Sequence, residues 1–502
     1  MPRHGRWVLA ATILGSSLAF IDGTAVNVAL PALQADLGAG VSELQWFVEA
    51  YMLLLAALLL VGGALGDRYG RRRVFATGVA IFALASLVCG AAPSSAWLIG
   101  ARAVQGVGAA LLVPGSLAII SAAFEGEARG KAIGTWSGVT AIMTAFGQVL
   151  GGWLVDHLSW RAIFYLNLPL AAVTLALLWR VPESRDSSAD HPLDWMGAAL
   201  ATLGLGGVVF ALIEAPGRGA DAWVIGAGLG GIAALVAYWR GEARSTHPMM
   251  PPALFRSPTF LGANGLTLLL YAALGGATFF LPYNLIQVQG YSATAAGAAM
   301  LPFILAMFLL SRWAGGLIAR YGARPPLVVG PAIAAVGFGL LAVPGVGGPY
   351  WSTFLPGIAV LGLGMAVAVA PLTTAVMGAV SQDKAGVASG INNAVSRVGG
   401  LLAVAVFGVV ILLAFSGGLE RRLAGIDLPD SARTTLHAHH ERLAELPPPT
   451  GLAPATRAAV ARAVDDAFVD GFRLAMGLAA LLAIASAAVA WRWVGAENRE
   501  TS

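Results

Sequence analysis

Fourteen apolar stretches constrain this chain more than any other feature of its sequence. Each is about 20 residues long, which is the length of helix that crosses the ~30 Å hydrocarbon core of a bilayer. A transmembrane β-barrel needs short segments of alternating polarity instead, and the sequence lacks that pattern. We therefore predict an all-α integral membrane protein whose spans lie at roughly 7–30, 44–66, 74–92, 97–122, 131–155, 160–181, 193–214, 222–239, 258–288, 293–318, 325–344, 351–378, 386–414 and 471–494.

Composition supports this class of protein. Only 11% of the residues are charged and 58% are hydrophobic, so a water-soluble fold would have too few charges for its surface. The net charge of +4 comes mainly from basic residues between the spans, which indicates membrane orientation and not nucleic-acid binding. Cys89 is the only cysteine, which excludes an intrachain disulfide and a cysteine metal cluster.

The distribution of Arg and Lys predicts the orientation in the membrane. The segments on one side carry 18 Arg and Lys residues, among them Arg68, Arg71 and Arg72, whereas the short loops on the other side carry only Arg161 and Arg218. By the positive-inside rule we expect a multi-pass protein of the inner (plasma) membrane with both termini cytoplasmic. The basic stretch 415–470 would then be outside, which is permissible because long loops cross largely regardless of charge.

Histidines 437, 439 and 440 in that outer stretch have no cysteine or well-spaced carboxylate beside them. We therefore interpret the stretch as a solvated, partly helical loop and predict no metal site. No cofactor-binding motif is evident either.

A short internal repeat indicates two related halves. The sequence Arg-Tyr-Gly-Arg-Arg at 68–72 follows the second span, and Arg-Tyr-Gly-Ala-Arg at 320–324 follows the tenth. Transporters are often built from such repeats. We predict an N-terminal six-helix bundle at 1–182, two inserted helices with flanking inner loops at 183–257, and a C-terminal six-helix bundle at 258–502 that includes the outer loop 415–470.

Ionisable residues inside the spans are the candidate functional groups, because each costs several kcal/mol in a membrane. Asp22, Glu49 and Arg102 all fall in the outer half of the first bundle, where two carboxylates can share a cavity with one guanidinium. One carboxylate would stay ionised while the other exchanged a proton. The alternatives are a static salt bridge for Asp22 and Arg102, and a Glu49 side chain that reaches the outer surface. Arg397 contacts either substrate or the opposite bundle.

The loop after the second span is a candidate gate on the inner side. We expect Gly63 and Gly66 to permit close helix approach. Asp67 can reach the arginines or backbone amides of a neighbouring helix end, which would form a charge clamp that breaks when the inner mouth opens. The clamp would include the residues that follow Asp67, namely Arg68, Gly70, Arg71 and Arg72. The alternative is a plain positive-inside anchor.

At these residues the chain resembles the major facilitator superfamily, and specifically its fourteen-helix drug:proton antiporter branch. The loop 63–73 is similar to the signature of the superfamily, residues 18–31 resemble the first-helix motif of the branch, and residues 102–108 resemble its fourth-helix motif. The resemblance implies a role in coupling or cation recognition for Asp22 and a role in proton transfer for Arg102. It also places the motif residues Asn27 and Gln105 in the same site.

The fifth helix departs from this pattern. The antiporter motif of the family places Gly-Pro before a Gly-Gly pair, whereas this chain has Gly147-Gln148 before Gly151-Gly152. The glycines still permit tight packing, but the kink that a proline would set is lost. Glu49 also replaces a position that is usually neutral, which adds a second titrating site or favours cationic substrates.

The resulting prediction is a proton-coupled secondary transporter that exports hydrophobic or cationic small molecules by alternating access. Its partners would be a small-molecule substrate, protons and the lipid bilayer, with no nucleic acid, and the protein would be a monomer. A dedicated exporter of one metabolite, amino acid or siderophore fits the same motifs. A membrane enzyme or channel fits poorly, and the absence of a G-x-x-x-x-G-K-[ST] sequence argues against an ATP-driven pump.

Overall fold

The computed structural model describes residues 4–185, 194–219, 221–246, 248–381 and 385–495. Over these residues the chain forms helices and no β-strand, and fourteen segments are long and apolar enough to cross a membrane. The predicted all-α fold with fourteen spans is therefore confirmed. The side chains of His437 and His440 lie outside the described part of the structure.

The spans follow the chain in three groups. The first six are α1 (Gly5–Leu37), α2 (Val41–Tyr69), α3 (Arg71–Gly90), α4 (Ser95–Ala123), α5 (Gly126–His157) and the pair α6 (Arg161–Tyr165) and α7 (Asn167–Leu178). The next two are α8 (Trp195–Arg218) and α9 (Ala222–Arg244), followed by a short 3-10 helix, η1 (Pro252–Arg256). The last six are formed by α10 (Pro258–Gln287), α11 (Ala293–Ala299), α12 (Leu301–Gly315), α13 (Leu317–Tyr321), α14 (Arg324–Leu341), α15 (Tyr350–Thr353), α16 (Leu355–Gly378), α17 (Ala385–Leu423) and α19 (Pro454–Trp493).

Three predicted spans are interrupted near prolines. The breaks at Leu166, Met300 and Phe354 each precede a proline by two or three residues, at Pro169, Pro302 and Pro356. A proline has no backbone N–H, so the carbonyl four residues earlier loses its helical donor. The spans Arg161–Leu178 and Ala293–Ser311 continue across their breaks, whereas the span after the third break is Leu355–Gly378 alone.

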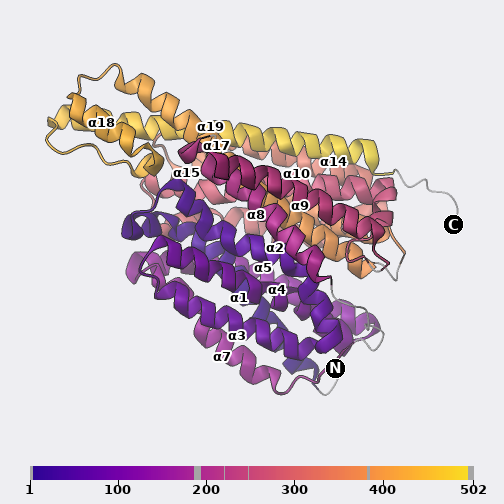
Figure 1. Cartoon of the computed structure of the whole chain (residues 1–502). Helices are drawn as coiled ribbons and strands as arrows, with labels where there is room; N and C mark the ends of the chain where they lie inside the picture. Colours follow the sequence, from indigo (N-terminus) through magenta and orange to yellow (C-terminus); the bar gives the residue numbers. More distant parts are fainter. Residues whose placement is uncertain (1–3, 186–193, 220, 247, 382–384, 496–502) are drawn as a thin grey trace.

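Two helices are much longer than a bilayer requires. At 39 and 40 residues, α17 and α19 are each roughly 60 Å long. Their joined ends, with α18 (Asp430–Ala438) and the 3-10 helix η3 (His440–Glu445) between them, project from one end of the molecule (Figure 1). The predicted loop 415–470 is thus too long at both ends, because residues 415–423 continue α17 and residues 454–470 begin α19. We name this end the α18 end, and the opposite end, where α1 begins and α19 finishes, the terminal end.

The helices associate as two bundles with the inserted pair at one side. In the first bundle α1 packs on α5 and α2 on α4, and in the second α10 packs on α17 and α19. The bundles meet where α5 contacts α11 and where α2 contacts α17. Helix α8 lies against α2 and α17, and α9 packs on α8 (Figure 1). The inserted pair therefore flanks one of the two seams between the bundles.

Candidate functional site in the N-terminal bundle

An ion pair between Asp22 and Arg102 lies at the centre of the first bundle. Asp22 is midway along α1, and Arg102 extends from the α18-end third of α4. An Nη of Arg102 donates to a carboxylate oxygen of Asp22 at 2.5 Å. The side chains are 0% and 1% exposed, so neither can exchange its partner for water without a change in the helices around it.

Neutral polar groups complete the environment of this ion pair. Gln105, one turn after Arg102, accepts from the guanidinium at 2.6 Å and donates to the second oxygen of Asp22 at 2.9 Å. Asn167, at the start of α7, donates to that same oxygen at 3.2 Å. Ser86 of α3 accepts from both amides, at 2.9 Å from Gln105 and 3.2 Å from Asn167. The cluster therefore ties together α1, α3, α4 and α7.

Helix α2 holds the other side of the guanidinium. The Nε of Arg102 donates to the backbone carbonyl of Phe47 at 2.8 Å. The guanidinium carbon lies 4.4 Å from the ring centre of Tyr51, an arrangement that favours a cation–π interaction. Arg102 thus contacts α1 through Asp22 and α2 through Phe47 and Tyr51, so a change in the charge of Asp22 alters contacts on both helices.

The charge balance of this cluster depends on the charge of Asp22. With Asp22 ionised, both of its oxygens accept hydrogen bonds, and the arginine is neutralised. If Asp22 takes up a proton, Arg102 keeps its charge because a guanidinium does not deprotonate in proteins, and it is left without a counter-charge. A buried charge without a partner costs several kcal/mol, which favours movement of α1, α2 or α4 until the guanidinium finds water or a ligand.

Glu49 does not share this guanidinium, contrary to our expectation. It is 1% exposed, and neither carboxylate oxygen has a hydrogen-bond partner among the described residues. Its burial also rules out the alternative in which it reaches the outer surface in this conformation. Gln45, one turn earlier on the same face of α2, donates to the carbonyl of Val404 on α17 at 2.7 Å. Glu49 therefore belongs to the seam between α2 and α17, where its carboxylate has no partner among the described residues.

Arg397 lies on the other side of the same seam. It projects from α17 and is half-buried, and it interacts electrostatically with Tyr51. Its Nε is buried and has no hydrogen-bond partner among the described residues, and it forms no salt bridge within them. Tyr51 therefore interacts with both Arg102, which has a carboxylate partner, and Arg397, which has none within the described chain. Asn27 is half-buried on α1, and its Oδ1 likewise has no partner there.

The loop after α2 forms a clamp at the terminal end, with one member that sequence analysis missed. Asp67 pairs with Arg71 at 2.8 Å within the loop itself. The carboxylate that accepts from backbone amides is Glu183, which binds the N–H groups of Arg72 and Arg73 at 2.9 and 3.2 Å. These amides open α3, where a helix end favours a negative charge. The clamp thus joins the start of α3 to the segment after α7.

Gly70 in this loop and Gly62 in α2 occupy positions where a side chain would not fit. Gly70 has φ +110°, and a Cβ there would lie 2.8 Å from the carboxyl carbon of Glu183. Close helix packing depends on Gly62, where a Cβ would lie 2.0 Å from the carbonyl oxygen of Ala110 on α4. The prediction for Gly63 and Gly66 is wrong for this conformation, because a Cβ at either meets only ordinary contacts at 3.8 Å.

The second copy of the loop motif repeats this backbone geometry. Gly322 has φ +79°, and the Arg320 guanidinium lies 5.3 Å from the Tyr321 ring. In the first copy the Arg68 guanidinium lies 5.5 Å from the Tyr69 ring. The internal repeat predicted from sequence therefore has a structural counterpart.

The glycines of α5 allow the close packing that we predicted. A Cβ at Gly147 or Gly151 would come within 2.6 Å of Thr24 or Ala25 on α1. A Cβ at Gly152 would lie 2.3 Å from the carbonyl oxygen of Ala293 on α11. The first two glycines therefore allow α5 to pack closely on α1 within its own bundle, and the third allows close contact with α11 of the other bundle.

Hydrogen bonds join the bundles at the α18 end. Asp156 on α5 accepts from the backbone amides of Ala293 and Thr294 on α11, at 3.0 and 2.8 Å. Tyr283 of α10 donates to Gln34 of α1 at 2.7 Å. These contacts close the seam at that end in this conformation.

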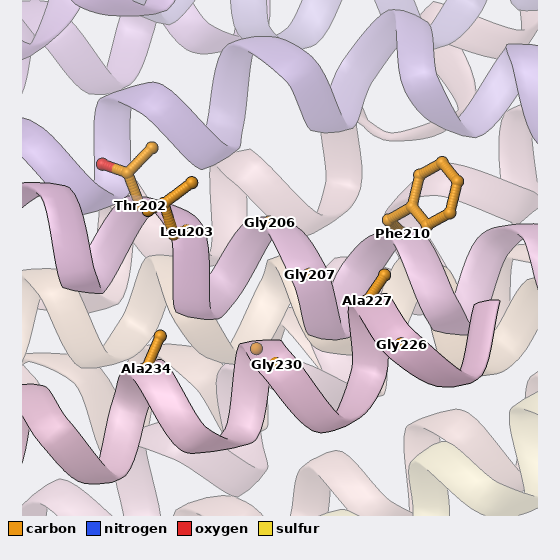
Figure 2. Close-up of a pocket in the computed structure, with 10 residues that line it drawn as sticks. Thr202, Leu203, Gly206, Gly207, Phe210, Gly226, Ala227, Gly230 and Ala234 are labelled. Carbon is orange, nitrogen blue, oxygen red and sulfur yellow. The ribbon is translucent and has the colours of Figure 1, made fainter. Parts of the chain in front are cut away.

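A groove of about 520 Å³ lies elsewhere, between the inserted helices α8 and α9. Figure 2 shows Thr202 and Phe210 on α8 and Ala227 and Ala234 on α9 beside a run of glycines. Its lining contains no ionisable side chain, and Leu203 is 67% exposed. The groove is therefore a glycine-lined surface of the inserted pair, separate from the charge cluster.

Sequence reasoning missed several members of the cluster. Ser86, Asn167 and Tyr51 are ordinary residues within apolar helices, and nothing in their spacing marks them. A signal was available for Glu183, because this acidic residue follows the sixth span on the same predicted side of the membrane as the arginines that open the third span. Fixing that contact required the fold.

The chain matches known proteins along most of its length. Residues 12–404 match the Major Facilitator Superfamily. The chain is 35% identical to the multidrug resistance protein Stp of Mycobacterium tuberculosis, over 98% of this chain and 93% of that protein. It is 33% identical to the tetracenomycin C resistance and export protein of Streptomyces glaucescens, over 96% and 90%.

Solved structures share the fold. A bacterial homolog of the human lysosomal transporter Spinster, in an inward-facing and unoccupied conformation, aligns with a TM-score of 0.67 and 18% identity, covering 99% of this chain and all of that chain. The xylose transporter XylE of E. coli in a partially occluded inward-open conformation aligns with a TM-score of 0.59 and 13% identity, covering 99% and 100%. At these identities the likeness establishes the architecture of the bundles.

Proposed function

The chain belongs to the Major Facilitator Superfamily, and on that premise we propose that it is a proton-coupled exporter of hydrophobic small molecules. Relatives at 33 to 35% identity are named for multidrug resistance and for resistance to and export of tetracenomycin C. The single observation that carries the proposal is the buried Asp22–Arg102 pair, because an ion pair inside a membrane bundle is costly unless its charge state is used.

Coupling follows from the contacts of the pair. A proton that enters from outside neutralises Asp22, which releases Arg102 and loosens the links from α4 to α1 and α2. Return of the proton to the cytoplasm restores the carboxylate and the compact cluster. Substrate that binds between the bundles would favour one of these two states, and this preference links substrate movement to proton movement.

Alternating access is proposed to occur at the two seams between the bundles. In the present conformation the contacts of Asp156 and Gly152 with α11 close the α18 end. Rocking of residues 1–182 against 258–494 would open this end and break those contacts. Glu49, inside the α2–α17 seam, is proposed as a second proton site that is exposed when the seam opens.

We place the protein in the plasma membrane with both termini cytoplasmic, on the basis of its charge distribution, and we propose that it acts as a monomer. The ion pair of Asp67 and the hydrogen bonds of Glu183 at the terminal end support the inner gate that the loop motif predicts.

The test is substrate-triggered proton flux in vesicles that contain the purified protein and a lumenal pH dye. Under an imposed pH gradient, addition of tetracenomycin C, puromycin or ethidium should change lumenal pH faster than in protein-free vesicles. The Asp22→Asn variant should abolish this flux. Asp36→Asn is the matched control, because Asp36 is on the same helix but pairs with Arg161 at the surface. Flux that is unchanged in Asp22→Asn would remove Asp22 from the mechanism.

A dedicated exporter of one compound is the second candidate. It is favoured by relatives named for single compounds, among them the puromycin resistance protein of Streptomyces alboniger, which is 36% identical over 80% of this chain. The same assay separates the two candidates, since a multidrug exporter responds to several unrelated compounds and a dedicated exporter to one.

A further inference from the structure

Arg397 is an arginine whose positive charge has no carboxylate partner in the described structure, although it lies at membrane depth. It occupies the thirteenth position of the 39-residue helix α17. Its neighbours one turn apart, Ala394 and Leu401, belong to apolar clusters formed with α2. The side chain therefore lies along the seam between the two bundles.

The guanidinium is only partly enclosed. The residue is half-buried, and Nε is buried without a hydrogen-bond acceptor among the described residues. The same atom of Arg102 donates to the carbonyl of Phe47, and an Nη of Arg102 donates to Asp22. A guanidinium has five donors in a fixed planar fork and cannot shed its proton, so Arg397 presents a permanent positive charge and unused donors.

Nearby groups do not supply the missing anion. Tyr51 interacts with Arg397 but is a neutral phenol whose ring already lies over the Arg102 guanidinium. Asp22 directs both oxygens to Arg102, Gln105 and Asn167. Glu49 makes no hydrogen bond or salt bridge to either arginine among the described residues.

We propose that Arg397 binds an anionic oxygen group of the transported molecule, such as a carboxylate or phenolate, between the two bundles. This inference rests on the proposed function and narrows it, because it selects amphipathic acids within the broad class of hydrophobic compounds. Charge-assisted, bidentate bonds to a planar fork are the strong form of this contact. The bound anion would lie next to Tyr51 and hence one side chain away from Arg102 and Asp22, which gives substrate and proton a shared point of contact.

The experiment compares three probes with one ring system: anthracene-9-carboxylate, 9-anthracenemethanol and (9-anthracenylmethyl)trimethylammonium. Binding to purified protein in zwitterionic nanodiscs is measured by fluorescence, and the signal of empty nanodiscs is subtracted. Wild-type protein should bind the carboxylate about 10- to 100-fold more tightly than the alcohol. Arg397→Gln should remove that advantage and leave the affinity for the alcohol unchanged, and Arg397→Lys should retain part of it because the charge remains.

Arg180→Gln is the matched control. It removes the same charge from the terminal end of the first bundle, where Arg180 lies 4.3 Å from the Trp7 ring. It should leave the preference for the carboxylate intact. Equal wild-type binding of carboxylate and alcohol, or an equal loss of all three probes in Arg397→Gln, would overturn the inference.

The two proposals fail in different ways. If tetracenomycin C or puromycin drives proton flux while the carboxylate has no advantage, the export function stands and the assignment of Arg397 falls. If the carboxylate depends on Arg397 but no compound drives proton flux, the anion site stands and proton coupling falls.

Discussion

The two bundles provide opposite surroundings for the arginine that each carries at membrane depth. In the N-terminal bundle Arg102 has a carboxylate, an amide, a backbone carbonyl and an aromatic ring around it. In the C-terminal bundle Arg397 has a tyrosine as its electrostatic neighbour and no carboxylate partner within the described chain. The paired arginine is suited to respond to protonation of its carboxylate partner, and the unpaired arginine is suited to bind a ligand reversibly. Under the proposed function, this difference would place proton coupling in the N-terminal bundle and substrate recognition in the C-terminal bundle.

The sharpest way to break this comparison is to remove the paired arginine. Arg102→Gln leaves Asp22 as an uncompensated buried charge, so we expect the free energy of unfolding to fall by about 3–5 kcal/mol. Denaturant titration in mild detergent measures it. The double variant Asp22→Asn, Arg102→Gln should recover part of the loss because the orphaned charge is gone. A single variant as stable as wild type would mean that the pair is not buried as described.

Between the bundles, Gly152→Ala should act on conformation more than on stability. The added methyl would meet the Ala293 carbonyl at the seam, and overpacking of this kind costs about 1–3 kcal/mol. We expect the α18 end to open, with a roughly 10-fold or greater rise in labelling of a cysteine introduced at Thr294. Gly134→Ala on the same helix is the control, since nothing lies within 4 Å of a Cβ there. Unchanged labelling would show that this contact does not hold the seam.

The unpaired arginine should behave differently in the same denaturant titration. Arg397→Gln removes a charge without orphaning another, so we expect stability within about 1 kcal/mol of wild type, or higher. A loss as large as that of Arg102→Gln would show that Arg397 has a structural partner, and it would erase the contrast between the halves.

The smallest effect is expected at the surface clamp of the terminal end. The Glu183 carboxylate is 27% exposed and its arginine partners are more exposed still, so Glu183→Gln should lower stability by about 1 kcal/mol or less. Because the clamp is proposed to be the inner gate, transport rate is expected to change more than stability does. If the transport rate changes no more than the stability does, the clamp is a simple anchor and not a gate. Initial rates of substrate-driven proton flux and melting temperatures supply the two readings.

Much of the fold follows from the sequence because spans are set by one strong rule, the length of apolar helix that a bilayer requires. The ends of α17 and α19 escaped prediction because polar residues beyond the membrane can continue a helix without any change in hydropathy. The breaks at Leu166, Met300 and Phe354 lie near prolines within long apolar segments, and hydropathy alone does not show that these prolines interrupt the helix.

The candidate site likewise contains some residues that the sequence predicts and others that it does not. Asp22 and Arg102 stand out because charged residues are rare in membrane spans. Their contact could be predicted because both lie at a similar depth in the same bundle. Glu49 has the same signal but a different partner helix, and the face of α2 on which it lies is decided by packing against α17. Neutral polar residues such as Asn167 and Ser86 cost little to place in a membrane span, so nothing in the sequence marks them as functional. Only the fold shows that they belong to the site.

The most direct test of the account is the infrared difference spectrum of the protein on substrate binding, read at the carboxyl C=O stretch. We predict that substrate changes the band of a protonated carboxyl, and that Asp22→Asn removes this change while Asp36→Asn keeps it. The same difference band in wild type and Asp22→Asn would contradict the claim that the charge state of the Asp22–Arg102 pair is linked to substrate.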